Sequence, residues 1–372
     1  MTIMPILTVN NLRVERGGIT VLDIPHFDLG EGENLAILGP NGAGKTTFLL
    51  TLARLLNYSQ GELLFKGQDI SRSELTVPYR RRLATVFQEP LLLNTTVFHN
   101  VAAGLKIRRM GKAEIEKRVA QYAALVKITH LLSRDARKLS GGEAQRANLA
   151  RAFATEPEMI LLDEPFANLD APSRDSLIND VHGILQQTET TAILATHDRL
   201  EALRLADRLA VMDGGKIVQI GACKEVMNHP ANEVVASFVG METVFSGLVL
   251  TVSDGSFVVE TAGHAVEAMG NVEKGETVLC CIRPENIIIS HPRAMEGTSV
   301  RNNLPARIVK ITPQGPFFKV HLDCGFFLAS YVTPQSLENL SLREGKAVTV
   351  SFKATAVHVI RREKLPPLTA VR

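Results

Sequence analysis

Short apolar runs alternate with helical patterns over the first 240 residues of the chain. Residues 35–38, 159–162 and 191–195 are such runs, and a glycine-rich turn with a helical pattern over 46–56 follows the first. Uninterrupted apolar runs of this length are typical of strands in parallel sheets, because helices cover both faces of such sheets. The pattern predicts a mainly parallel α/β domain over residues 1–240.

A long helical pattern interrupts this alternation. It extends over residues 89–138, and the segment 112–126 has apolar positions on one face and polar positions on the other. We therefore expect a helical subdomain, at about residues 89–150, inserted into the α/β domain.

After residue 240 the pattern becomes that of an all-β protein. Five short alternating runs, 246–252, 277–282, 306–311, 318–322 and 347–352, are separated by Gly, Pro, Asn and Asp. Segments 272–288 and 342–358 each contain a charged turn with glycine, an apolar strand, a basic residue (Arg283 or Lys353) and a second strand. We expect an all-β, OB-like domain over residues 241–372, built as a duplicated small barrel.

Length and charge narrow the class of protein. The 372 residues exceed what one hydrophobic core usually supports, which agrees with two domains. Lys and Arg total 41 against 39 Asp and Glu, so no overall positive field attracts nucleic acid. The basic clusters at 80–82 and 106–109 are interpreted as solvated faces. We expect no nucleic-acid partner.

The chain also has no signal for crossing or leaving a membrane. No run approaches the roughly 20 apolar residues that span a bilayer, and residues 1–10 lack the pattern of a secretion leader. The cysteines have no metal-ligand spacing and are expected to be reduced core residues: Cys223, Cys280, Cys281 and Cys324. A role at a membrane would require docking on a partner protein.

The first chemical motif directly follows the run at 35–38. Residues 39–46 read Gly-Pro-Asn-Gly-Ala-Gly-Lys-Thr and fit the phosphate-binding pattern G-x-x-x-x-G-K-[ST] between a strand and a helix. Glycines let backbone N–H groups surround a phosphate, and the positive helix end favours its charge. Lys45 supplies a cation for the β- and γ-phosphates, and Thr46 a hydroxyl for Mg²⁺. The expected nucleotide-binding residues are Gly39, Pro40, Asn41, Gly42, Ala43, Gly44, Lys45, Thr46 and Thr47.

Two further motifs lie at element ends. Asp163 and Glu164 end the run at 159–162; the first suits the shell of Mg²⁺ and the second suits polarisation of an attacking water. Residues 139–143, Leu-Ser-Gly-Gly-Glu, precede another helix. Ser140 and the two glycines therefore predict a second anion site at a helix start.

Together these motifs resemble the ABC ATPase family. The segment that resembles its signature motif consists of Leu139, Ser140, Gly141, Gly142 and Glu143. Gln88 matches the Q-loop, Asp170 the D-loop and His197 the switch histidine, all in the order of the family. The resemblance implies ATP and Mg²⁺ as cofactors. It assigns Thr46, Gln88 and Asp163 to the metal, and Glu164, His197 and Gln88 to catalysis.

The family resemblance also implies a homodimer. Two cassettes pair head to tail, and each ATP lies between the phosphate loop of one and the Ser140 segment of the other. ATP binding closes the pair, and hydrolysis opens it. The helical insert, with Gln88 at its hinge, transmits this motion to transmembrane permease subunits at the cytoplasmic face of the membrane. A periplasmic or extracellular substrate-binding protein is an indirect partner.

One position departs from the family pattern. ABC proteins usually stack an aromatic residue on adenine just before a glycine near the start, where this chain has Arg16-Gly17-Gly18. A guanidinium can also stack on a base. ATP binding is therefore retained, but a strict preference for ATP over GTP is not implied.

The C-terminal segment resembles the molybdate-binding Mop domain and TOBE-like domains, through residues 299–304, 331–336 and 351–357. The resemblance implies an oxyanion site that uses Ser299, Arg301, Asn302, Ser336 and Lys353. Alternatively, these residues only hold strand ends and turns together, as in related β domains of sugar or iron importers.

The full set of resemblances implies an ATP-hydrolysing subunit of a molybdate or tungstate importer. Ferric iron, sulfate or sugar are the alternative cargoes, because the cassette itself does not touch cargo. A non-transport ABC ATPase would be favoured by tandem cassettes, a coiled-coil insertion or a basic arm, and the sequence has none of them. A pure oxyanion sensor is disfavoured because Glu164 and His197 are intact.

Overall fold

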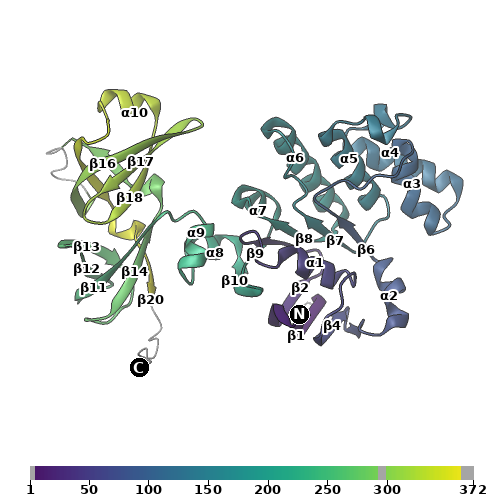
Figure 1. Cartoon of the computed structure of the whole chain (residues 1–372), viewed down its shortest axis with the longest axis horizontal. Coiled ribbons are helices and arrows are strands. Elements are labelled where there is room, and N and C mark those ends of the chain that lie inside the picture. Colours follow the sequence, from purple (N-terminus) through teal and green to yellow (C-terminus); the bar gives the residue numbers. More distant parts are fainter. Residues whose placement is uncertain (1–4, 292–298, 362–372) are drawn as a thin grey trace. The chain divides into compact units, whose positions relative to one another are not determined.

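The computed structural model describes residues 5–291 and 299–361; residues 1–4, part of the segment assessed for a leader, lie outside these ranges. Two compact units are present, Met1–Lys224 and Glu225–Arg372 (Figure 1). The division falls within α8 (Cys223–Asn228), whereas the sequence places the boundary after residue 240. The guanidinium of Arg283 donates to the carbonyls of Met227 and Val239, which ties α8 and α9 (Glu233–Phe238) to the β-rich unit.

The first unit is built on a six-stranded sheet with the order β10-β9-β3-β8-β7-β6. Its strands are β3 (Asn34–Leu38), β6 (Leu83–Val86), β7 (Met159–Asp163), β8 (Thr191–Thr196), β9 (Arg208–Asp213) and β10 (Lys216–Ala222). All neighbours are parallel except β9 and β10. The three apolar runs form the buried strands β3, β7 and β8, which confirms the expected parallel α/β fold.

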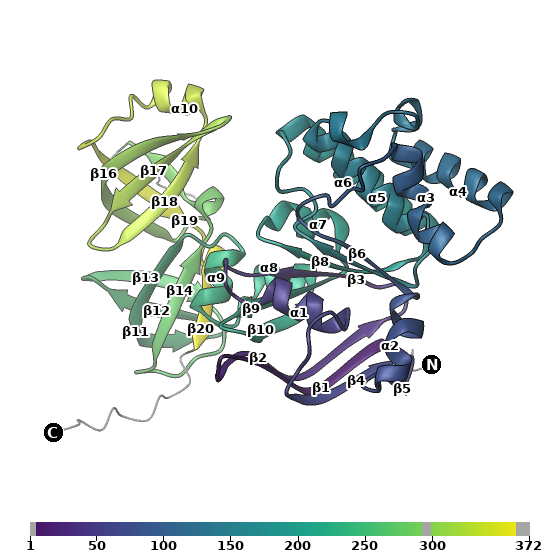
Figure 2. The ribbon, with the colours of Figure 1, turned by 45° about the vertical axis from the view of Figure 1, so that its right-hand side comes forward.

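Both faces of this sheet are covered, as Figure 2 shows. Leu162 and Leu194 face a core shared with α3 (Val97–Ile107), α4 (Lys112–Leu125), α5 (Gly141–Phe153) and α6 (Ala171–Thr188). Leu161 and Ile193 face a second core with α1 (Lys45–Leu52). Burial on both faces explains why these strands are uninterrupted apolar runs.

The second core is closed by an antiparallel sheet with the order β2-β1-β4-β5, which the alternation of strands and helices did not predict. It contains β1 (Pro5–Arg16), β2 (Ile19–Gly30), β4 (Gln60–Phe65) and β5 (Gln68–Asp69). The β1–β2 hairpin turns on Gly17 and Gly18, both with positive φ, as type I′ two-residue turns require. α2 (Ser73–Arg80) follows this sheet.

The helical insert contains α3, α4 and α5, joined by the 3₁₀ turns η1 (Thr129–Leu131) and η2 (Ala136–Lys138). The expected amphipathic helix at 112–126 is confirmed as α4. Buried Asn100 accepts from the N–H of Leu93 at 2.7 Å and donates to its carbonyl at 3.0 Å. Asn100 thereby holds the loop that enters α3.

The second unit consists of two five-stranded antiparallel sheets that share one core. One has the order β13-β12-β11-β14-β20, with β11 (Thr243–Ser253), β12 (Ser256–Thr261), β13 (His264–Met269), β14 (Thr277–Ile282) and β20 (His358–Arg361). The other has the order β15-β19-β16-β17-β18, with β15 (Ile288–Ser290), β16 (Asn302–Gln314), β17 (Phe317–Asp323), β18 (Phe327–Val332) and β19 (Ala347–Phe352). The expected all-β domain is confirmed. A helix α10 (Pro334–Asn339) and two 3₁₀ turns, η3 (Pro284–Asn286) and η4 (Ala354–Ala356), complete the unit.

The expected duplication is visible in the connections. In the first copy β14 leads through η3 to β15, and in the second β19 leads through η4 to β20. The short last strand of each copy pairs with the sheet of the other copy: β15 with β19, and β20 with β14. The two copies are therefore interlocked in two open sheets that share one core, not two consecutive barrels.

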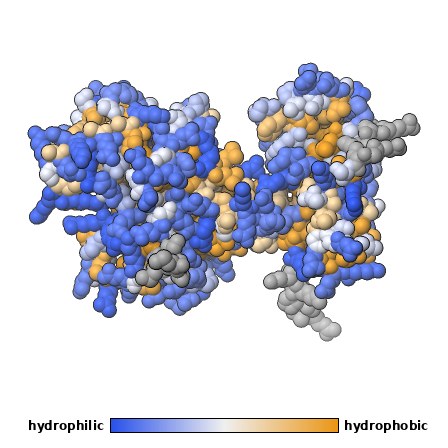
Figure 3. Space-filling model, turned by 180° about the vertical axis from the view of Figure 1, so that it is seen from behind, coloured by the Kyte–Doolittle hydropathy of each residue, from blue (hydrophilic) through white to orange (hydrophobic). Residues whose placement is uncertain are grey.

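In the described ranges, no helix combines the length and apolar character needed to cross a bilayer. The face of the molecule in Figure 3 is largely hydrophilic, with small scattered hydrophobic patches.

Candidate functional site

The phosphate-binding loop joins β3 to α1 and borders a hollow of about 420 Å³. Gly42 and Gly44 have φ values of 84° and 101°, a region that other residues rarely adopt. A Cβ on Gly39 would lie 2.3 Å from the carbonyl oxygen of Met212, so the loop is packed against β9. Gly44 precedes α1 without a side-chain cap, which leaves the first backbone N–H groups of the helix available to an anion.

Lys45 is held in place below this loop. It is 6% exposed, and its Nζ donates to the carbonyls of Gly39 at 2.8 Å and Pro40 at 3.1 Å. Burial lowers the pKa of Lys45, although the nearby carboxylates of Glu164 and Asp163 oppose this shift. A bound phosphate would add a further favourable partner for the ammonium group.

Thr46 and Asp163 meet at the end of β7. The Thr46 hydroxyl donates to Asp163 Oδ1 at 3.1 Å, and burial raises the pKa of Asp163. These ligands are both oxygen atoms, which Mg²⁺ prefers, and a divalent cation would offset the cost of burying the carboxylate. Gln88 also borders the hollow, so all three residues assigned to the metal lie at this site. The donor set fits Mg²⁺.

Glu164 occupies a constrained position between Lys45 and His197. Its φ of 45° is unusual for a residue other than glycine, and its N–H donates to the carbonyl of Ala195 at 2.9 Å. One carboxylate oxygen lies 3.9 Å from Lys45 Nζ and the other 3.2 Å from His197 Nδ1. Strained backbone of this kind persists where the surrounding structure holds a side chain at a working position.

Two buried polar residues that the sequence analysis missed support this arrangement. Gln145 of α5 donates to the carbonyl of Pro165, next to Glu164, at 2.8 Å. Glu201 in α7 (Arg199–Leu205) is 4% exposed and accepts from the hydroxyl of Thr196, which precedes His197. Burial raises the pKa of Glu201. Polar residues on otherwise amphipathic helices resemble surface residues in a sequence, so only the packing reveals these two.

The signature segment lies away from the nucleotide hollow. Ser140 caps α5: its Oγ accepts from the N–H of Glu143, and Glu143 Oε2 accepts from the N–H of Ser140 at 2.8 Å. None of the residues 139–143 borders the 420 Å³ hollow. Asp170 caps α6, and its hydrogen bonds from Ser173 lower its pKa. The starts of α1 and α5 are thus two separate places in the chain, and only the start of α1 borders the hollow.

Arg16 borders the nucleotide hollow from the tip of the β1–β2 hairpin, together with Val21. The side chain of Arg16 is exposed, and Val21 is the apolar side chain beside it. Arg16 is the residue at the sequence position where the family resemblance leads us to expect an aromatic side chain. The guanidinium is therefore available to a base or to phosphate oxygens.

The oxyanion residues expected in the second unit are only partly brought together. Ser299, Arg301 and Lys353 border a hollow of about 430 Å³, but so do Asp254 and Glu267. Arg301 is already paired with Glu267 at 2.6 Å. The carboxylates of Glu267 and Asp254 therefore make this hollow less favourable for an anion than a purely basic one.

The other two expected oxyanion residues have structural contacts. Asn302 is 2% exposed, and its amide pairs with the backbone N–H and carbonyl of Glu267 at 2.7 and 2.9 Å. Ser336 lies in α10, hydrogen-bonded to Thr333, and does not border the hollow. These contacts agree with the alternative in which such residues hold the β structure together.

Residues 22–167 match the ABC transporter family, and residues 298–359 match the TOBE domain. A molybdate/tungstate import ATP-binding protein, WtpC of Pyrococcus horikoshii, is 39% identical over 341 residues, covering 90% of this chain and 94% of the relative.

Two further similarities cover less of the chain. The spermidine/putrescine import ATP-binding protein PotA of Trichodesmium erythraeum is 38% identical over 73% of this chain and 74% of its own length. The structure of cbiO1 from Clostridium perfringens, part of the ABC transporter complex cbiONQ, matches with a TM-score of 0.57 and 29% identity. It covers 64% of this chain and 95% of the solved chain.

Because Arg16 borders the nucleotide hollow, we expect its guanidinium to stack on the base of ATP. Replacing Arg16 with Ala should weaken ATP binding about two- to fivefold, because a stacked guanidinium contributes about 0.5–1 kcal/mol at an exposed site. Arg16→Tyr should restore the affinity, since an aromatic ring provides the same platform. Competition against a fluorescent nucleotide measures all three affinities.

Inorganic tripolyphosphate is the control ligand for this prediction, because it has no base. Its affinity should be the same for the parent chain and Arg16→Ala. If Arg16→Ala weakens tripolyphosphate as much as ATP, Arg16 contacts phosphate and not the base.

Proposed function

Because the chain belongs to the ABC transporter family, as an ATP-hydrolysing subunit of an importer, we propose that it drives the uptake of molybdate or tungstate. The main support for this proposal is the extent of the similarity to WtpC. The similarity covers 90% of the chain and therefore includes parts of both units. The similarity to the polyamine import protein covers a smaller share of the chain, 73%. A polyamine is the second candidate cargo.

The nucleotide would bind in the hollow beside β3 and α1. The backbone N–H groups of residues 39–47 and the ammonium of Lys45 would surround the β- and γ-phosphates. Thr46, Gln88 and Asp163 would hold Mg²⁺, which neutralises charge on the phosphates.

Hydrolysis would take place at the γ-phosphate beside Glu164. One Glu164 oxygen can accept a hydrogen bond from the attacking water and orient it in line with the phosphorus. His197, 3.2 Å from Glu164, would fix this carboxylate and contact the γ-phosphate. Gln145 and Glu201 act as positioning residues, because they hold the loops on which Glu164 and His197 lie.

The separation of the two anion sites supports a homodimer. The Ser140 segment does not border the hollow of its own chain, and its helix start has no phosphate to bind there. A second copy arranged head to tail would place its Ser140 segment over the ATP of the first copy, which completes both sites. Closure of such a pair would move the helical insert through the segment that follows Gln88, and transmembrane permease subunits at the cytoplasmic face would receive this motion. A substrate-binding protein would deliver cargo to those subunits.

The role of Glu164 can be tested with purified protein. Glu164→Gln should bind ATP but lose turnover on the order of 10²-fold or more, because an amide cannot accept a proton from water as a carboxylate can. ATP-bound dimers should accumulate on gel filtration, and Glu116→Gln on the exposed face of α4 is the matched control. Near-normal hydrolysis by Glu164→Gln would contradict this role.

The cargo can be tested in cells that lack the chain. Such cells should fail to accumulate molybdate and tungstate, the parent gene should restore uptake, and the Glu164→Gln gene should not, since ATP turnover drives transport. Metal analysis of washed cells measures the uptake. Normal molybdate and tungstate content together with a loss of polyamine, iron or sugar uptake would overturn the proposed cargo.

An oxyanion site in the second unit is a separate prediction. Lys353→Ala should weaken molybdate binding about tenfold, the value of one charge-assisted hydrogen bond. Glu267→Gln should strengthen binding, because it releases Arg301 from its carboxylate partner. Calorimetry on the full chain measures both, with exposed Lys310→Ala as the control. Equal affinities for all four proteins, or no binding, would leave these residues with a purely structural role.

A further inference from the structure

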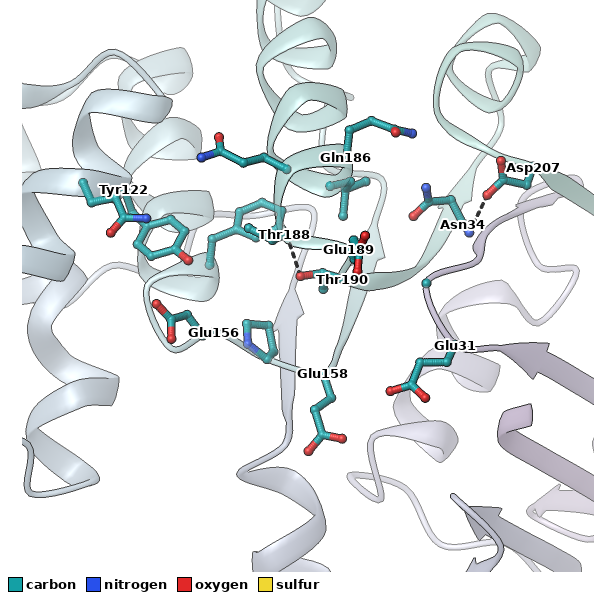
Figure 4. Close-up of a pocket in the computed structure, with 16 residues that line it drawn as sticks. Glu31, Asn34, Tyr122, Glu156, Glu158, Gln186, Thr188, Glu189, Thr190 and Asp207 are labelled. Carbon is teal, nitrogen blue, oxygen red and sulfur yellow. Dashed lines mark hydrogen bonds between the residues drawn. The ribbon is translucent and has the colours of Figure 1, made fainter. Parts of the chain in front are cut away.

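A hollow of about 930 Å³ lies at the edge of the main sheet opposite the phosphate loop (Figure 4). It is surrounded by the loops that precede four adjacent parallel strands, β9, β3, β8 and β7. Each loop contributes at least one carboxylate: Asp207, Glu31, Glu189, and the pair Glu156 and Glu158. No Lys, Arg or His is among the described residues that border the hollow.

Three of these carboxylates are already neutralised by basic side chains outside the hollow. Glu158 pairs with Arg82 and Lys66, Glu156 with Arg118, and Glu31 with Lys66. In the described part of the chain, Glu189 and Asp207 have no basic side chain at ion-pair distance. The hollow therefore has two carboxylates in excess.

Glu189 lies at an electrostatically unfavourable place. It caps the carboxyl end of α6 with a φ of 50°, and the last turn of that helix has no basic residue. The carboxyl end of a helix carries partial negative charge, which cations stabilise and anions do not. A ligand with positive charge would compensate both the helix end and the carboxylate.

The side chain of Asn34 is a second, independent observation, because its oxygen has no hydrogen-bond donor. It is 7% exposed, and its backbone N–H donates to Asp207 Oδ2 at 2.9 Å. Its side-chain Oδ1 is buried and has no hydrogen-bond partner, which is costly unless a ligand or solvent supplies a donor. Figure 4 shows the Asn34 amide extending from β3 into the hollow, toward the loop of Glu189 and Thr190.

The positions of the acceptors around the hollow favour an organic cation over a metal ion. A metal ion needs several ligands that converge on one point, and the described residues contain no group of three His, Cys, Asp or Glu placed to hold one. Here the acceptors are spread around a hollow whose wall also contains Tyr122, Phe153 and Leu185. These three apolar side chains are nearly fully buried, so the ligand is indicated by the spread of the acceptors alone. Acceptors at separate places around one hollow match a ligand that carries several ammonium groups along one chain.

We propose that this hollow binds a linear organic polyamine, with ammonium groups on Glu189, Asp207 and the amide of Asn34. The site is independent of the nucleotide site, because the two lie at opposite ends of the same parallel strands. It is also independent of the proposed cargo, because spermidine binding is measured on the chain alone, without transport.

Calorimetric titration of the full chain with spermidine, without nucleotide, tests the proposal. One molecule should bind per chain, and Glu189→Gln should weaken binding about tenfold, because it removes one charge-assisted contact. Glu74→Gln, an exposed carboxylate on α2 that does not border the hollow, should bind as the parent chain does. Asn34→Leu, which keeps the number and branching of the side-chain heavy atoms, should weaken binding while the thermal unfolding temperature shows that the chain is folded.

Three outcomes would overturn the proposal. They are the absence of saturable spermidine binding, an equal effect of Glu189→Gln and Glu74→Gln, and binding of Mg²⁺ alone that depends on Glu189. The first two would leave the carboxylates as a solvated face, and the third would make this a metal site.

Discussion

Parallel hydrogen bonding between β3, β7 and β8 is the constraint on which the rest of the first unit depends. Strands that run in one direction end at the same edge of the sheet. The sheet itself therefore brings together the phosphate loop after β3, the carboxylates at the end of β7 and the histidine after β8. The cost is that both faces of the sheet must be covered, and the two cores that do so occupy most of the unit. Hydrogen bonds such as Gln145 to the Pro165 carbonyl then adjust positions that the sheet has already determined.

Much of this arrangement could be predicted from the sequence, because its signals are local. Buried parallel strands are apolar runs, and the phosphate loop needs glycines at fixed places. The antiparallel sheet was missed for a physical reason. In β1 the buried residues change from Leu7 and Val9 to Leu12 and Val14, because Asn11, with a φ of 48°, interrupts the alternation. A one-residue irregularity of this kind shifts the alternation of buried and exposed residues, and that alternation is the pattern by which strands are recognised in a sequence.

The site shows the same division between local and non-local information. Lys45, Thr46, Asp163 and Glu164 were expected and border or adjoin one hollow. The sequence did not indicate Gln145, Glu201 or Asn34. The role of a buried polar side chain depends on which atoms, distant in the sequence, lie next to it in the fold. In the second unit, residue types alone could not show that Arg301 is paired with Glu267 or that Asn302 is a buried link between strands.

The exchange of strands in the second unit has a consequence for how the chain acquires its structure. β20 pairs with β14, so the first of the two sheets lacks one edge strand until the ribosome has made residues 358–361. Pairing between segments so far apart raises the contact order of this unit, and such topologies fold slowly. The first unit contains all its own strands and is synthesised earlier, so it can fold while the β unit is still an open sheet with an exposed edge. Loss of a few residues near position 360 would therefore affect the first-made copy as much as the last.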